Sequence, residues 1–195
     1  MSAVARRSIV ALKLPEDGVA RFAFQFGLAF AGSILLALSS KVSVMLGPVD
    51  LSMQSLTVML LATAFGFRLG IATVLLYLAE GAMGFPVFQG TPEKGIGLAY
   101  MAGPTAGYLV GFVLMAGVMG WAADRGWDRS VLRLAMAGLI GTIVLLGCGY
   151  AWLTVLFGHG NAWAWGVGPF ILPAILKLGL AAIVPAALWA ILSRE

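Results

Sequence analysis

The sequence predicts an all-α, polytopic integral membrane protein. Of its 195 residues, 61% are hydrophobic and only 10% are charged, and the mean hydropathy is +1.00. A soluble domain carries about 25% charged residues. The apolar residues gather in long runs, and a helix needs about 20 such residues to cross a bilayer. Most of this chain is therefore expected to lie in lipid.

Apolar runs of sufficient length occur six times along the chain. We expect membrane-spanning helices at residues 22–40, 51–66, 69–84, 103–122, 132–156 and 169–191. The second and third are short, and only the sequence GFRLG at 66–70 separates them. They should form a tight helical hairpin that places Arg68 at a membrane interface. Together the helices make a single membrane domain over residues 1–195.

The basic residues predict the orientation of these helices. With six spans, both termini lie on one side of the membrane. Of the 12 Lys and Arg residues, Lys41 and Lys94 fall on the opposite side, Lys177 falls inside the last span, and all others lie on the side of the termini. Basic residues concentrate in cytoplasmic loops. Both termini are therefore expected in the cytoplasm, with residues 1–21 as a retained cytosolic segment.

Several function classes lack the residues that they need. The net charge is +4, but the basic residues are scattered at helix ends, which does not favour a nucleic-acid partner. The sequence GTPEKGIG at 90–97 lacks the Gly-Lys-Ser/Thr of a phosphate loop and the third glycine of a dinucleotide motif. The single histidine, His159, has no second histidine, cysteine or aspartate near it. We therefore predict no enzyme activity, no metal site and no nucleotide cofactor.

Two charged residues fall well inside predicted spans, where charge is costly and usually marks a ligand site or an ion pair. Lys177 and Glu80 each lie about 8 to 12 Å below the outer face. Lys177 favours a ligand site, with structural pairing as the alternative. Glu80 either pairs with Lys177 or extends to the interface. Spans two, four and six begin at this face, and helix N-termini favour anions, so the sequence predicts an outward-facing pocket for a small carboxylate.

The remaining motifs each allow two interpretations. Small residues recur every four positions at Gly103, Gly107 and Gly111, and also at Ala23, Gly27 and Ala31; such stripes let helices pack closely within the bundle or against a partner. The tryptophan-rich segment 152–166 is either an interfacial aromatic belt or a lid that stacks on a ligand. Residues 85–102 are expected to form an extracytoplasmic lid loop. The sequence DRGWDR at 124–129 is typical of a solvated turn.

Three segments resemble one known family. GPVDLSMQSLTVMLLATAFGFRLGIATVLLYLAEGAMGFPVFQG at 47–90 and GPTAGYLVGF at 103–112 are similar to the BioY family, with a weaker similarity in PFILPAILK at 169–177. Members of this family are the biotin-binding S components of energy-coupling-factor (ECF) vitamin transporters. The resemblance implies a six-helix protein of the bacterial cytoplasmic membrane that captures biotin on its outer side. It also implies a transmembrane coupling subunit and a pair of ATP-binding subunits as partners, which hydrolyse the ATP.

The resemblance extends unevenly to the site. The last helix of the family carries Pro-Gly-Asp-x-x-Lys, whose lysine corresponds to Lys177, whereas Pro173 and Ala174 replace the glycine and aspartate. Leu109 stands where some members have arginine. From the residues and the resemblance together we expect a charged contact from Lys177, hydrogen bonds from Gln54, Thr105 and Tyr108, apolar walls from Phe85, Phe88 and Trp163, and Glu80 as the partner of Lys177.

Each assigned role has a structural alternative. Gln54 could cap the second span, Tyr108 could belong to an aromatic belt, and Phe85 and Phe88 could pack the loop. The function likewise has two alternatives, an S component for another small vitamin and a membrane scaffold without a ligand pocket. Membrane lipid is an expected partner in every case, and a homo-oligomer is compatible with the small-residue stripes.

Overall fold

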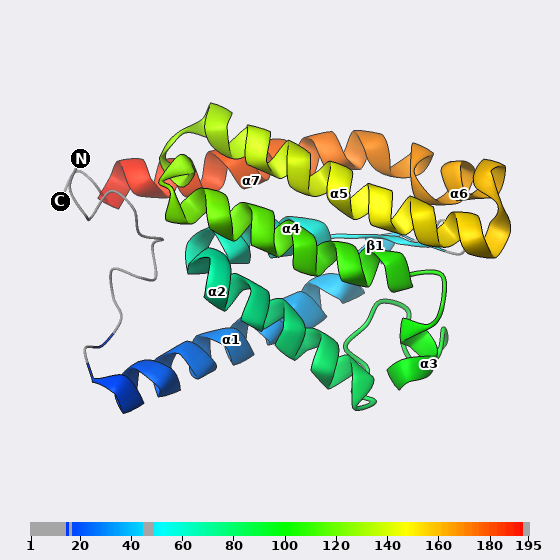
Figure 1. The fold of residues 1–195 in the computed structure, drawn as a ribbon, viewed down its shortest axis with the longest axis horizontal. Helices are drawn as coiled ribbons and strands as arrows, with labels where there is room; N and C mark the ends of the chain where they lie inside the picture. The colour runs from blue at the N-terminus through cyan, green and yellow to red at the C-terminus, as the bar shows by residue number, and fades with distance from the viewer. Residues whose placement is uncertain (1–14, 16, 45–48, 193–195) are drawn as a thin grey trace.

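Long helices packed side by side make up the structure, which is a computed structural model that describes residues 15, 17–44 and 49–192 (Figure 1). The helices are α1 (Gly18–Lys41), α2 (Gln54–Ala82), α3 (Gly97–Met101), α4 (Ala106–Asp124), α5 (Val131–Phe157), α6 (His159–Gly166) and α7 (Ile171–Leu192). The 3-10 helices η3 (Trp127–Arg129) and η4 (Gly168–Phe170) and the strands β1 (Ser43–Val44) and β2 (Leu51–Ser52) complete the described elements. Most of the expected cytosolic segment 1–21 lies outside the described residues.

The described helices are those of a polytopic membrane protein. Five stretches are long and apolar enough to cross a membrane, at Gly18–Lys41, Gln54–Ala82, Ala106–Asp124, Val131–Phe157 and His159–Ile191. These stretches coincide with the apolar runs of the sequence. The predicted second and third spans both fall within α2.

The chain reverses direction inside α2, as the sequence predicted for residues 66–70. Gly66 has φ 81° and ψ −177°, a non-helical conformation that glycine adopts readily. Ala62 and Gly70 are eight residues apart, and in a straight helix they would be separated by about 12 Å. A Cβ built on Gly70 would instead lie only 3.0 Å from the Cα of Ala62. Residues 54–65 and 67–82 are therefore two helical arms of a hairpin.

The first arm begins later than expected, because the residues before it form a strand. Leu51 pairs with Val44 and Ser52 with Ser43 in a short antiparallel ladder. The amide N of Met53 then donates to the carbonyl of Val42, at 3.1 Å. The predicted helical start at residue 51 was therefore wrong, and the ladder is an addition to the expected all-α fold.

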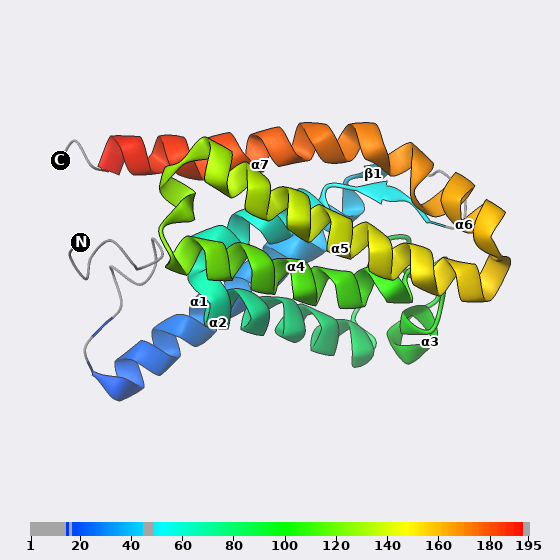
Figure 2. The same ribbon diagram turned by 45° about the horizontal axis from the view of Figure 1, so that its top comes forward.

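Helix α4 is the centre of the bundle, between α2 and α5 (Figure 2). Met115, Ala116 and Met119 are fully buried. A Cβ on Gly107 would lie 2.4 Å from the carbonyl oxygen of Cys148, so only glycine lets α5 approach this closely. The small-residue stripe of α4 thus packs within the bundle, whereas the stripe of α1 is exposed.

Different elements form the two ends of the bundle. Helices α3 and α6 and strand β1 lie at one end, while the start of α1, the end of α7 and η3 lie at the other (Figure 1).

Our expectation of a solvated turn at 124–129 was wrong for Asp128, which is fully buried. Its Oδ2 accepts a hydrogen bond from Trp189 Nε1, and the Arg129 guanidinium lies 4.3 Å from the centre of the Trp189 ring. A favourable contact with α7 therefore explains its burial.

Candidate functional site

A cavity opens between the starts of α2, α4 and α7 at the end of the bundle that carries α3 and α6. Its volume is about 60 Å³, well below the roughly 300 Å³ at which small-molecule sites begin, so the lining side chains have to move apart before a ligand of that size can enter. The floor is apolar and comes from α2, α4 and α5, through Met59, Phe112, Met115 and Leu145. Polar side chains surround the upper part, so the cavity suits a molecule with an apolar body and polar groups.

Lys177 supplies the positive charge of this cavity. Its side chain lines the cavity and the residue is only 8% exposed. The ammonium donates to the carbonyl of Ser52 and, at 3.1 Å, to the hydroxyl of Ser55. An ammonium has three donors, so within the described residues one N–H remains for a ligand. Both of these partners are neutral groups, so the positive charge of Lys177 is not cancelled by them and can attract an anion.

The expected ion pair between Lys177 and Glu80 is absent from the described residues, so this prediction was wrong. Glu80 does not line the cavity, and its carboxylate accepts a hydrogen bond of 2.8 Å from Ser33 on α1. The packing of α1 against α2 therefore turns the carboxylate away from α7. Glu80 joins two helices and does not replace the aspartate missing at position 174.

Gln54 lies at the first turn of α2 and lines the cavity. Its amide nitrogen donates to the hydroxyl of Tyr77 at 2.6 Å, and this hydroxyl donates to the carbonyl of Val87 at 3.2 Å. The two hydrogen bonds link both arms of α2 to the loop that follows. The residue at the helix cap is Met53, so Gln54 does not act as that cap. The carbonyl oxygen of its side chain can accept a hydrogen bond from a ligand.

Thr105 and Tyr108 reach the cavity from the start of α4. The Tyr108 hydroxyl donates to the carbonyl of Gly166 at 2.6 Å, and its ring stacks on Phe170 with centroids 6.0 Å apart. Tyr108 is therefore an interior wall and not a residue of an aromatic belt. Thr105 hydrogen-bonds Tyr100, whose own burial is the main cause that raises the pKa of its hydroxyl above the ordinary value. Tyr100 consequently stays protonated and able to donate at neutral pH.

The remaining predicted site residues lie outside the cavity. Phe88 is buried between Tyr77 and Tyr100, with ring centroids 5.4 Å and 4.8 Å away, and it packs the loop. Phe85 is 57% exposed and Trp163 54% exposed, and neither lines the cavity. The apolar-wall prediction was therefore wrong for all three. The exposed indole of Trp163 fits the alternative of an interfacial aromatic residue.

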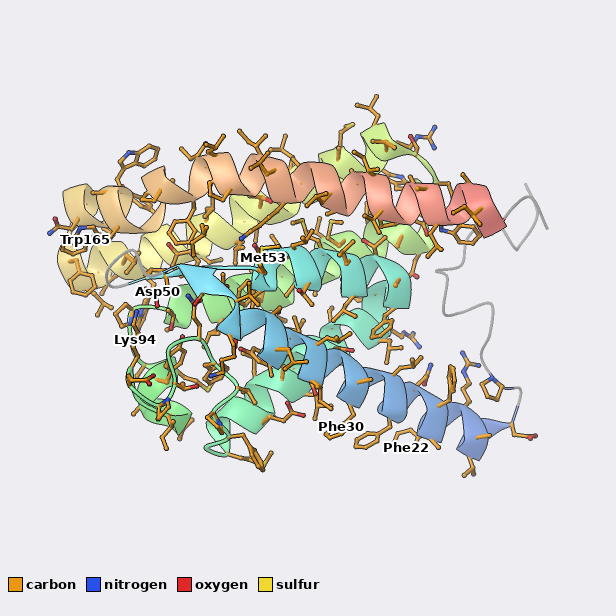
Figure 3. The ribbon with its side chains drawn as sticks, turned by 180° about the vertical axis from the view of Figure 1, so that it is seen from behind. Phe22, Phe30, Asp50, Met53, Lys94 and Trp165 are labelled. Carbon is orange, nitrogen blue, oxygen red and sulfur yellow. The ribbon has the colours of Figure 1, made fainter. Side chains whose placement is uncertain are left out.

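The structure adds polar residues that the sequence interpretation had missed. Gln89 lines the cavity, is 7% exposed, and its amide nitrogen has no hydrogen-bond partner among the described residues. Asp50 also lines the cavity and forms an ion pair of 2.6 Å with Lys94 (Figure 3). A buried donor without a partner is costly, so a ligand acceptor next to Gln89 would be stabilising. A glutamine between a buried aromatic residue and a glycine turn was the available sequence signal.

The loop 84–102 supplies Gln89 and Tyr100 to the cavity wall and is attached to the bundle at several points. Lys41 donates to the carbonyl of Phe88 at 2.9 Å and to the hydroxyl of Thr91 at 3.0 Å. Lys94 reaches Asp50 across the mouth. Lys41 and Lys94, which were predicted to lie on the side opposite the termini, therefore both hold this loop in place.

Comparison with known proteins decides the family. Residues 16–194 match the model of the BioY family. The chain is a member of the BioY family. It is 36% identical over 153 residues to the biotin transporter BioY of Thermotoga maritima, covering 77% of this chain and 86% of that protein. It is 34% identical over 150 residues to the probable biotin transporter BioY of Pyrococcus horikoshii, with the same two shares of the chains covered.

The BioY fold is also seen in a solved structure. The crystal structure at 2.1 Å of the S-component for biotin from an ECF-type ABC transporter superposes with a TM-score of 0.76, at 19% identity, over 90% of this chain and 95% of that chain. At this identity the likeness establishes the fold. Two of the three positions at which this BioY chain departs from the expected family residues, Ala174 and Leu109, line the cavity. These two departures therefore lie within the site itself.

Proposed function

We propose that this BioY protein captures biotin at the outer face of a bacterial cytoplasmic membrane and serves as the S component of an ECF-type transporter. The observation that carries the proposal is the cavity with Lys177 in its wall and an apolar floor. Biotin has a carboxylate, an apolar chain and ring, and a ureido group that donates and accepts hydrogen bonds. The names of the relatives that match this chain support the same ligand.

The groups around the cavity can be matched to those of biotin. Lys177 binds the carboxylate, which is attracted to the ammonium in a site of low dielectric constant. The side chains of Gln54 and Gln89 and the hydroxyl of Thr105 pair with the ureido group. Met59 and Phe112 contact the chain and the ring. The contact from Gln89 is new in this assignment, because the sequence had not pointed to Gln89 as a site residue.

The proposed topology has six spans, with the α2 hairpin counted as two and both termini in the cytoplasm. The reversal at Gly66 and the arginines at that end of the bundle support it. Residues 84–102 then form the outer lid, within a single membrane domain. Uptake requires a coupling subunit and a pair of ATP-binding subunits, and the exposed stripe of Ala23, Gly27 and Ala31 on α1 offers a face for such a partner.

The test is binding of radiolabelled biotin to the protein purified in detergent, together with its thermal unfolding. Saturable binding and a stabilisation of about 4 kcal/mol at a ligand concentration of a thousand times Kd are expected. Competition by unlabelled vitamins separates biotin from a second candidate ligand, another small vitamin. We include another small vitamin as a candidate because Ala174 stands in the cavity wall where the family resemblance led us to expect an aspartate. If no vitamin bound or stabilised the protein, the scaffold alternative would replace this proposal.

A further inference from the structure

An open groove lies at the arginine-rich end of the bundle, remote from the cavity. It has a volume of about 650 Å³ and runs between α1 and the second arm of α2. Phe22 and Phe26 of α1 and Leu69 and Leu76 of α2 form its apolar walls. Phe22 lies near the start of α1, where that helix stands apart from the rest of the bundle (Figure 3). The groove is thus an apolar surface that the described residues leave uncovered.

The groove is wedge-shaped, because α1 and α2 are packed together from Gly32 toward the end of α1 and diverge toward its start. A Cβ on Gly32 would lie 2.6 Å from Cγ2 of Thr73, so the two helices are in close contact there. Ala29, one turn earlier, is still 6% exposed, whereas Phe26 is 56% and Phe22 71% exposed. At 100° per residue these side chains share the face that carries the buried Leu36. The same face of α1 is therefore covered by protein in one half and uncovered in the other.

Two arginines stand at the open end of the wedge. Arg21 and Arg68 both line the groove, and neither guanidinium has an ion pair within the described residues. The backbone at Arg68 is held in place, because the amide of Phe67 donates to the carboxylate of Asp124 at 3.0 Å. The mouth of the groove therefore presents two positive charges at its rim, one of them on a backbone anchored to α4.

The length of the groove corresponds to one leaflet of a bilayer. From Gly32 to Arg21 is 11 residues of α1, or about 16 Å. Half of a hydrocarbon core of about 30 Å is about 15 Å. With the contact point near the middle of the membrane, the guanidiniums of Arg21 and Arg68 lie at the level of the phosphates of the lipid headgroups.

We propose that this groove binds an anionic phospholipid, with its phosphate between Arg21 and Arg68 and an acyl chain along the exposed phenylalanines. Guanidinium groups hold phosphate through charge-assisted hydrogen bonds, and basic pockets between helices bind anionic headgroups. A lipid fits better than a protein helix, because the small-residue stripe around Gly27 lies on the opposite face of α1, about half a turn away. A protein partner can pack there while the lipid stays bound.

The experiment compares phosphatidylglycerol with phosphatidylcholine of the same acyl chains. Delipidated protein in mild detergent is titrated with each lipid, and native mass spectrometry and the unfolding temperature are measured. Wild-type protein should retain phosphatidylglycerol in preference and be stabilised more by it. Arg21→Gln and Arg68→Gln should each weaken this binding about fivefold, and the double variant about 25-fold. Arg133→Gln, which removes an exposed arginine outside the groove, should leave it unchanged.

Three results would overturn the proposal. The first is that wild-type protein retains phosphatidylglycerol and phosphatidylcholine equally and is stabilised equally by both. This comparison needs no variant, so it remains informative even if a variant misfolds. An equal loss in Arg133→Gln would mean unspecific attraction to the basic end. A dimer of the wild type that the double variant abolishes would assign the groove to a second copy of the chain. Biotin binding should persist in all four variants, since the cavity lies at the other end of the bundle.

Discussion

Lys177 is the residue on which the proposed chemistry depends most. Within the described residues its ammonium contacts a carbonyl and a hydroxyl and no carboxylate. The aspartate that the family resemblance led us to expect one turn earlier is Ala174, and Glu80 is held by Ser33 instead. The charge of Lys177 is thus available to a ligand, and selectivity for an anionic ligand should depend on this side chain.

Lys177→Met tests this role, because methionine keeps an unbranched side chain and removes the charge. Biotin affinity should fall at least about tenfold, the lower range for a lost hydrogen bond to a charged group. The affinity for biotin amide, which has no carboxylate, should fall much less. If both affinities fell equally, Lys177 would be a structural residue that holds Ser52 and Ser55 and not the carboxylate contact.

Asp128 predicts a dependence of stability on pH. Its burial is the main cause that raises the pKa of its carboxyl above the ordinary value. The folded protein therefore binds this proton more tightly than the unfolded chain does. The resulting stabilisation is complete below the ordinary pKa and is lost as the pH rises through the raised folded-state pKa.

Asp128→Asn is the matching variant, since the amide keeps an acceptor for Trp189 and stays neutral. Its unfolding temperature should be close to that of the wild type at acidic pH and should exceed it at neutral pH. The measurement is a series of thermal unfolding curves in detergent from acidic to neutral pH. A constant difference between the two proteins over that range would contradict the assignment to Asp128.

The sequence identified part of the site at this scale, for a physical reason. Lys177 was conspicuous because a charge inside an apolar run is costly, and Gln54, Thr105 and Tyr108 are polar residues near predicted helix starts. The structure brings these four around one cavity; that they contact a ligand stays a prediction. Gln89 and Asp50 lie in loops, where polar residues are ordinary, and only the folding of the loop over the bundle places them at the cavity.

At the scale of elements, the packing of α4 against α5 depends on single glycines. A Cβ on Gly107 would meet the carbonyl oxygen of Cys148 at 2.4 Å and the Cβ of Trp152 at 2.6 Å. Gly147, on α5, has no atom within 4 Å of its built Cβ. The two positions therefore form a matched pair of helical glycines, one in contact and one open.

Gly107→Ala should destabilise the protein by about 1 to 3 kcal/mol through overpacking. Gly147→Ala should be neutral or stabilising by up to about 1 kcal/mol, because alanine favours a helix. Thermal unfolding in detergent measures both. Equal effects of the two substitutions would mean that α4 and α5 are not packed as closely as the structure has them.

The loop over the cavity is the second element whose role can be measured. Lys94 ties it to the buried Asp50, whereas its neighbour Glu93 is exposed. Lys94→Met should raise the rate of biotin dissociation about fivefold, equivalent to about 1 kcal/mol for a partly exposed ion pair. Glu93→Gln should leave that rate unchanged, and the same acceleration in both variants would contradict a closing role for the ion pair.

At the scale of the whole molecule, the proposed topology can be tested with introduced cysteines. Cys148 is the only native cysteine, so Cys148→Ala gives a clean background. Gly160→Cys, at the α6 end, should react with a membrane-impermeant maleimide in intact cells. Ser130→Cys, before α5, should react only after permeabilisation. The reverse pattern would invert the proposed orientation, with the cavity facing the cytoplasm.

The general architecture was predictable because lipid requires long apolar segments whose backbone is internally hydrogen-bonded. The reversal at Gly66 was also predictable, since two short apolar runs flank GFRLG. The buried Asp128 was not, because its contact with Trp189 joins segments 61 residues apart. The strand pair β1–β2 was not either, because Leu51 belongs to an apolar run that is typical of a helix. Leu51 reads as the start of an apolar helix until its pairing with Val44 is known.

The short first arm of α2 affects how deep the ligand lies. Residues 54–65 measure about 18 Å along the helix, less than the thickness of the hydrocarbon core of about 30 Å. In the proposed orientation, the turn at Gly66 lies near the inner boundary of the hydrocarbon core. Gln54 then lies about 12 Å below the outer boundary of that core. If biotin binds at that depth in the proposed orientation, it has crossed about two fifths of the hydrocarbon core before any ATP is used. In the proposed transport cycle, the ATP-driven partners then move the ligand through the remaining three fifths.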